Sequence, residues 1–167
     1  MELKTTILKH LKMLFMLIFI TILLLAFIIY YKLDGSMFLW IMSIFYLSVY
    51  LIPTLFIHFK YSVISNNIIF KIDYSGITKI ENGEKIFYEN SKIEEIVIYG
   101  TANRILDSGY REFVFENYFY AEIKLIENDP LIITCLFSSK IDKILSIYFN
   151  DKKVKKVKLF YPLIQKH

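Results

Sequence analysis

Histidine is the first residue type to examine for chemistry, because its imidazole serves as metal ligand, general base and proton carrier. The 167-residue chain has three, and they stand far apart as His10, His58 and His167. None has a second ligand or base close to it in sequence, so none forms a metal-binding or nucleophile motif. We therefore interpret each histidine as solvent-exposed or as lying at a membrane boundary.

The carboxylates, glycines and cysteine form no recognisable active site either. Glu94 and Glu95 are adjacent in a predicted strand, where neighbouring side chains point to opposite faces and cannot act as a paired acid and base. The five glycines are scattered through predicted turns and build no phosphate-binding loop. Cys135 is the only cysteine, which excludes an intrachain disulfide, and we expect it to be a small buried side chain. The sequence thus predicts a protein that is not an enzyme and has no catalytic, cofactor-binding or metal-binding residues.

One irregular stretch is a candidate binding loop. Gly100 to Tyr110 is the longest connection between predicted strands, and loops of this length on a rigid scaffold often bind a partner. Its candidate contact residues are Arg104, Tyr110 and Arg111, and the alternative is a solvated loop. An aromatic-rich run follows from Phe113 to Tyr120, which suits core packing or an interface with protein or lipid headgroups.

The positive charge is concentrated at the carboxyl end. Residues 60–150 carry ten Lys and Arg against thirteen Asp and Glu, whereas residues 151–167 carry six Lys against one Asp. This distribution argues against a nucleic-acid-binding face on the folded domain. Apolar residues recur at spacings of three and four up to Pro162, which predicts a helical basic tail that contacts anionic lipid headgroups. A solvated tail that packs its aromatic residues on the domain is the alternative. The candidate contact residues are Lys152, Lys153, Lys155, Lys156 and Lys158.

Two apolar runs must position everything else. Residues 13–31 and 37–59 carry no charged side chain, and the nineteen residues of the first give a helix of roughly 28 Å, close to the thickness of the bilayer core. A cleaved signal peptide is the competing interpretation of the first run, but the run is longer than a usual signal core and no A-x-A cleavage site follows it. We predict a transmembrane helical hairpin over residues 13–59, in which Pro53 kinks the second helix.

After the hairpin the pattern changes to near alternation. This predicts about seven antiparallel strands over a domain at 62–150, followed by one amphipathic helix with a capping box at Ser139 and Asp142. A linker over 61–67 precedes the first strand. Because the strands and the capping helix can bury a core without lipid, we expect a chain that begins near Tyr61 to be soluble and to fold alone. The predicted strands are 68–73, 77–80, 85–88, 93–99, 111–115, 119–126 and 131–137.

This arrangement resembles the bacterial membrane-anchored pleckstrin-homology-like (PH-like) proteins. The resemblance is clearest at Asp73-Tyr74-Ser75-Gly76-Ile77-Thr78, in the strand Ile93 to Ile98, and from Leu131 to Leu145. It implies a bent sandwich or barrel capped by a helix, usually a binding or scaffold module. Lipid-binding relatives gather basic residues around the first hairpin loop, but only Lys71 and Lys79 flank the loop that begins at Asp73. Phosphoinositide recognition is therefore not implied.

The leading hypothesis is a multi-pass protein of the cell (inner) membrane, integral to the lipid bilayer, whose cytoplasmic PH-like domain binds a protein partner or self-associates. The alternative is a small immunity or stress-response membrane protein that acts through its hairpin. In either case residues 1–12 form a cytoplasmic amino terminus. Three lysines precede the first helix and Lys60 closes the second, whereas Lys32 and Asp34 balance in the connection, so the positive-inside rule places both termini in the cytoplasm.

The predicted topology is testable by labelling. A cysteine introduced at Ser36 should react with a membrane-impermeant thiol reagent on intact cells, because the connection between the helices lies outside the cytoplasm. A cysteine at Asn66 is the matched control and should react only after permeabilisation. The reverse pattern, with protection of position 36 and labelling of position 66, would invert the topology.

Overall fold

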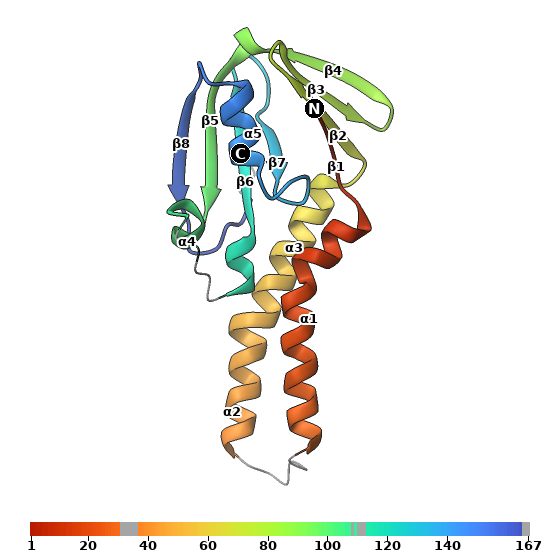
Figure 1. The fold of residues 1–167 in the computed structure, drawn as a ribbon, viewed down its shortest axis with the longest axis vertical. Coiled ribbons are helices and arrows are strands. Elements are labelled where there is room, and N and C mark those ends of the chain that lie inside the picture. Colours follow the sequence, from red (N-terminus) through yellow and green to blue (C-terminus); the bar gives the residue numbers. More distant parts are fainter. Residues whose placement is uncertain (31–36, 108, 110–112, 165–167) are drawn as a thin grey trace.

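The computed structural model describes residues 1–30, 37–107, 109 and 113–164. Figure 1 shows a two-helix column that projects from one end of a β domain made of two sheets. Each sheet has four strands, in the orders β1-β2-β3-β4 and β7-β6-β5-β8. The predicted fold class, a helical hairpin followed by a mainly antiparallel β domain with a helix after it, is confirmed.

The hairpin consists of α1 (Ile7–Tyr30) and a second continuous helix that contains α2 (Met37–Phe45), a π-helical segment η1 (Tyr46–Leu51) and α3 (Ile52–Ser65). Both helices are long and apolar enough to cross a membrane. Most of their apolar side chains face away from the rest of the protein: only Leu17 is buried in α1, and no residue is buried in α2. A polar pair joins the two helices near their middle, because the Thr21 and Tyr46 hydroxyls lie 2.6 Å apart.

The π-helical segment ends just before Pro53, where the sequence predicts a kink. A proline removes one helical N–H, and a π-helix shifts the backbone pairing from i+4 to i+5. The chain therefore adapts to Pro53 by widening one turn and a half of helix upstream of it.

Sheet A begins before the hairpin. β1 (Glu2–Lys4) pairs antiparallel with β2 (Ile68–Asp73), so that Leu3 lies opposite Phe70. Residues 1–12 are therefore not a separate terminal segment, because Leu3 is 2% exposed and belongs to the core. The hairpin occupies the connection between the first two strands, and the loop at Asp73 is the second connection of the domain.

Two tight turns join the remaining strands of sheet A, β3 (Gly76–Glu81) and β4 (Glu84–Glu89). The Asp73 carboxylate accepts hydrogen bonds from the backbone N–H groups of Ser75 and Gly76 at 2.9 and 3.1 Å. A hydrogen bond from the Ser75 hydroxyl lowers the pKa of Asp73, so the turn is held by an ionised side chain. Gly76 is required sterically, because a Cβ there would lie 2.1 Å from the Tyr88 carbonyl oxygen.

Sheet B contains β5 (Ile93–Gly100), β6 (Phe119–Leu125) and β7 (Leu131–Thr134) in antiparallel order, after a short helix η2 (Asn90–Lys92). Its fourth strand is β8 (Lys153–Lys158), which pairs parallel to β5. The predicted helical tail is therefore wrong. The free edge of β5 offers a ladder of backbone partners, and Glu95 accepts a charged hydrogen bond from Lys155 at 2.6 Å.

The predicted helix after β7 is α5 (Ile141–Tyr148), and its start differs in detail from the prediction. The predicted capping box does not form, because the N-cap is Lys140 and Asp142 instead pairs with Arg104 at 3.2 Å. Between β5 and β6 lie α4 (Ala102–Ile105) and the 3-10 helix η3 (Val114–Asn117). The strand predicted at 111–115 is therefore wrong over Val114 and Phe115; residues 111 and 112 lie outside the described residues.

The carboxyl end of α3 is part of the domain core. Tyr61 is fully buried, donates a hydrogen bond to the Pro162 carbonyl at 2.7 Å and packs edge-on against Tyr118 and Tyr120. One turn later, the buried Ser65 and Thr134 hydroxyls lie 2.6 Å apart. The connection to β2 is only two residues, 66–67, in place of the seven predicted. A chain that begins near Tyr61 would lose both β1 and Ile57 from the core.

The structure predicts that Leu3 stabilises the β domain, although it precedes the hairpin. Leu3→Ala should lower the free energy of unfolding of the domain by about 2 to 5 kcal/mol, because it removes buried methyl groups and leaves a cavity. The measurement is denaturant unfolding of the full chain in detergent. Glu2→Ala, at the exposed neighbouring position, should change the stability by less than about 0.5 kcal/mol. Equal effects of the two changes would show that β1 is not anchored through Leu3.

Candidate functional site: a pocket at the root of the hairpin

A cavity of about 470 Å³ lies where the hairpin meets the β domain. We call it the junction pocket. Its walls come from β1, the first turns of α1, Arg104 of α4, the start of β6 and the segment after β7. The lining residues are Met1, Glu2, Leu3, Lys9, Lys12, Met13, Met16, Arg104, Asn117, Phe119, Cys135, Phe137, Ser138 and Ser139.

Cationic groups outnumber anionic ones in this lining. Lys9, Lys12 and Arg104 contribute three positive charges, and Glu2 is the one carboxylate among the lining residues. Glu2 is already paired with Lys71, at 3.7 Å and outside the pocket. The local field of the junction pocket therefore favours an anion.

Arg104 is fixed in place by three different contacts. Its guanidinium pairs with Asp142 at 3.2 Å, donates to the Ser139 carbonyl at 3.3 Å and lies 3.9 Å from the centre of the Phe119 ring. The charge of Arg104 is thus largely used to join α4 to α5 and to the sheet. Arg104 therefore serves mainly as part of the pocket wall, and less as a group that binds a ligand.

Lys9 and Lys12 are placed differently. The Lys9 ammonium donates hydrogen bonds to the carbonyls of Phe137 and of Lys4, the latter at 2.7 Å. These bonds hold the start of α1 against the segment after β7, but they do not neutralise the charge. Lys12 is exposed one turn further along the same helix. Within the described ranges of the chain, no carboxylate lies within 4.0 Å of either ammonium group.

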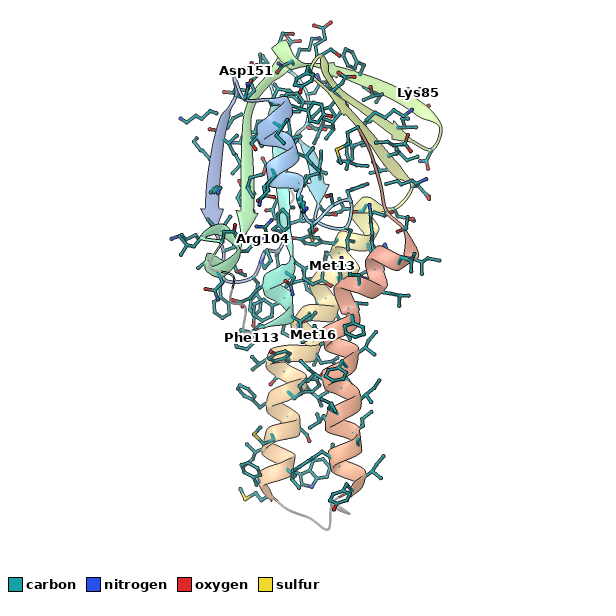
Figure 2. All side chains as sticks on the ribbon, viewed as in Figure 1. Met13, Met16, Lys85, Arg104, Phe113 and Asp151 are labelled. Atoms are coloured by element: carbon teal, nitrogen blue, oxygen red, sulfur yellow. The ribbon has the colours of Figure 1, made fainter. Side chains whose placement is uncertain are left out.

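Apolar side chains form the wall below the lysines. Figure 2 shows Met13 at the root of the hairpin and Met16 one turn further from the domain. Met13 packs against the domain core, and Met16 is half exposed. Phe119 and Phe137 close the inner side, and Asn117, Ser138 and Ser139 add polar groups. The junction pocket is therefore amphipathic: positive charge lies beside Lys9 and Lys12, and the surface further along α1, away from the domain, is apolar.

Cys135 lies in the inner wall of the junction pocket and is buried. Burial raises the pKa of its thiol to about 12, because the thiolate would be poorly solvated there. The thiol is therefore protonated at physiological pH, and it is not activated as a nucleophile.

A second polar feature beside the pocket connects both helices to the domain. His10 Nδ1 lies 3.2 Å from His58 Nε2, and His58 Nδ1 lies 2.8 Å from the Tyr118 hydroxyl. Their distance in sequence hid this contact, because the antiparallel helices bring positions 48 residues apart together. No group of three or more His, Cys, Asp or Glu residues suitable for a metal occurs among the residues that the structure describes. His167 lies outside them.

Aromatic side chains join the hairpin to the underside of the domain. The Tyr50 ring of η1 lies 5.2 Å from the Phe113 ring, which stacks on Phe115 at 5.1 Å. Phe115 in turn contacts Tyr161 at 4.9 Å and the exposed Phe160 at 6.5 Å. Figure 2 shows Phe113 on the side of the domain that faces the hairpin. The aromatic run singled out in the sequence thus serves both core packing and this contact.

The lysines proposed as a membrane contact do not gather on one surface. They follow β8, which starts beside Asp151 at the end of the domain furthest from the hairpin and runs toward α4 (Figures 1 and 2). Lys155 pairs with Glu95, and Lys152 pairs with Asp151. Lys158, at the α4 end of the strand, is the one placed nearest the hairpin. Contact between this segment and anionic lipid remains a prediction.

The predicted partner-binding loop is only partly described. Arg104 lies in α4 and is held by Asp142, whereas Tyr110 and Arg111 lie outside the described residues. The sequence analysis missed Lys9, Lys12, Met13 and Met16 as site residues, because it used the lysines only to orient the hairpin. Their spacing of three and four along one helix was the available signal.

The fold is that of a pleckstrin-homology-like domain. Seven strands in two sheets are followed by a helix, with the hairpin inserted between the first two strands. The PH_40 family, described as a PH domain, matches residues 2–146, which include β1, the hairpin and most of α5. The chain therefore belongs to this family of PH domains. No curated protein and no solved structure gives a match.

The raised pKa of Cys135 predicts slow alkylation. In the folded chain at pH 8, Cys135 should react with iodoacetamide at least about 1,000-fold more slowly than in the unfolded chain, because both thiolate fraction and access are reduced. The measurement is the mass shift of the intact protein over time, with and without denaturant. A Ser36→Cys variant supplies a second thiol as an internal control of reagent activity. Rapid alkylation of Cys135 in the folded chain would contradict its assigned environment.

Proposed function

We propose that the protein is a non-enzymatic, integral membrane protein whose PH domain acts as a binding or scaffold module at the inner face of the cell membrane. The observation that carries this proposal is the continuous apolar surface of the hairpin. Large side chains along its whole length are exposed, including Phe15 at 62%, Ile29 at 75% and Trp40 at 67%. Soluble monomers rarely expose apolar patches of this extent, and a lipid bilayer covers them.

The orientation in this proposal follows from the position of the lysines. Lys9, Lys12 and Lys60 all lie at the domain end of the hairpin, and under the positive-inside rule this supports a cytoplasmic β domain. The Tyr50, Phe113 and Phe160 rings lie at the same end, where aromatic side chains favour the headgroup level.

The module is held rigidly at the surface. α3 enters the core without a flexible linker, and the His10–His58–Tyr118 chain crosses from hairpin to domain. A protein partner or a second copy of the chain would thus meet the exposed surfaces of the β domain at a fixed height above the bilayer. A nucleic acid is not the proposed partner, because residues 60–150 carry a net negative charge.

Membrane insertion is tested with charges on the exposed face of the hairpin. Leu25→Lys together with Ile44→Lys should reduce the membrane-integrated fraction, because each lysine near the bilayer centre costs about 2.5 to 3.5 kcal/mol. The measurement is the fraction that resists alkaline extraction from membranes. Leu25→Met with Ile44→Met is the matched control and should stay integrated. If the lysine variant and the wild type are both soluble and monomeric, the hairpin is not a membrane anchor.

The role of the soluble part is tested separately. Replacing residues 18–49, the part of the hairpin away from the domain, with an unrelated transmembrane hairpin of the same length keeps Met13, Ile57 and His58 in place. It should preserve any partner contact of the PH domain, detected by crosslinking in intact cells. Loss of all such contacts, with a folded domain, would favour the alternative in which the hairpin is the active part.

A further inference from the structure

We propose that the junction pocket binds one anionic phospholipid, with its phosphate beside Lys12 and Lys9 and its acyl chains along α1. This inference rests on the proposed membrane insertion and assigns a ligand to the pocket. Three observations carry it: the uncompensated charge, the stripe on α1 below it, and the mixed chemistry of the walls.

The unpaired positive charges of the pocket lining favour a ligand with a small negative charge. Lys9 and Lys12 have no carboxylate within ion-pair distance among the described residues, whereas Arg104 and Glu2 are each paired elsewhere. The Lys12 ammonium, beside the Lys9 ammonium that donates to the carbonyls of Lys4 and Phe137, can pair with the negative charge of a phosphodiester. Asn117, Ser138 and Ser139 add polar groups to the same lining. Lysine suits this role because it binds phosphate as a point charge.

The apolar face of α1 offers a surface for the acyl chains. Lys9 and Lys12 lie three residues apart, Met13 and Met16 follow them four residues further on, and all four therefore lie on one face of α1. The same spacing continues through Ile20, Leu23 and Phe27, so this face is apolar for the rest of the helix. A lipid whose phosphate lies in the junction pocket would thus place its chains against that stripe, in the direction of the bilayer interior.

The residues that line the pocket favour a lipid over a free anion as the ligand. A site for inorganic phosphate would be lined by polar donors, but Leu3, Met13, Met16, Phe119 and Phe137 form much of this pocket. Its volume of about 470 Å³ is within the range of sites for small organic ligands and exceeds what one phosphate group fills. The ligand is therefore amphipathic.

The test uses the full chain in phosphatidylcholine nanodiscs that contain a small fraction of phosphatidylglycerol. Native mass spectrometry should show one phosphatidylglycerol retained per chain. Lys12→Gln should weaken retention about fivefold, the effect of one lysine near an anionic lipid, and Lys12→Arg should restore it. Lys60→Gln is the matched control, because Lys60 lies at the same end of the hairpin but over the Phe56 ring and outside the pocket.

Three results would overturn the assignment. Equal losses in Lys12→Gln and Lys60→Gln would show general surface attraction in place of a site. Displacement of the lipid by millimolar inorganic phosphate would identify a soluble anion as the ligand. Equal retention of phosphatidylcholine would remove the role of charge. Failure of the wild type to enter nanodiscs at all would instead contradict the proposed membrane insertion.

Discussion

The burial of the last turns of α3 inside the β domain is the contact on which the rest of the structure depends. Tyr61 is at the centre, because its ring packs on two tyrosines of the β6 region and its hydroxyl satisfies the carbonyl of Pro162. Ser65 then reaches Thr134 at the end of β7. A buried hydroxyl without its partner is costly, so these bonds fix both the depth and the rotation of the helix in the core. The domain and the hairpin consequently form one body.

The pairing of β1 with β2 is a second contact that joins the hairpin to the β domain. Leu3 completes the core from the other side of the hairpin, and Lys9 fastens the start of α1 to the segment after β7. The pairing of β1 with β2 therefore joins two segments that the whole hairpin separates in sequence. Pairing of residue 3 with residue 70 is a long-range contact, which makes late closure of this edge the expected order of folding. The junction pocket exists because two chain segments separated by the hairpin enclose it.

Much of this architecture is readable from local patterns, and the exceptions share a cause. The apolar runs, the strands around Asn82-Gly83 and the amphipathic helix at 141–148 follow from periodicity and turn chemistry, which are properties of neighbouring residues. β1 is too short to show a period, and β8 was misread because Val154, Val157 and Tyr161 also fit a helix; only the open edge of β5 decides between them. The contact of His10 with His58 and the junction pocket likewise depend on segments that are far apart in sequence and meet in the fold. Tertiary contacts thus determined most of the candidate site, whereas local sequence determined most of the fold.

The π-helical segment has a consequence for how this protein can vary. A π-turn accommodates one more residue than the equivalent α-helical span, and each residue turns an α-helix by about 100°. The segment therefore absorbs one extra residue while it keeps the rotational phase between the part of the helix that carries Met37–Phe45 and the part anchored by Tyr61. Loss of a single residue within 46–51 would restore an ordinary helix and leave the same face of the far half turned toward α1. In an ordinary α-helix the same loss would rotate the far half of the column by about 100°. A one-residue difference at this point would thus leave unchanged which helix face meets α1 or a neighbouring chain.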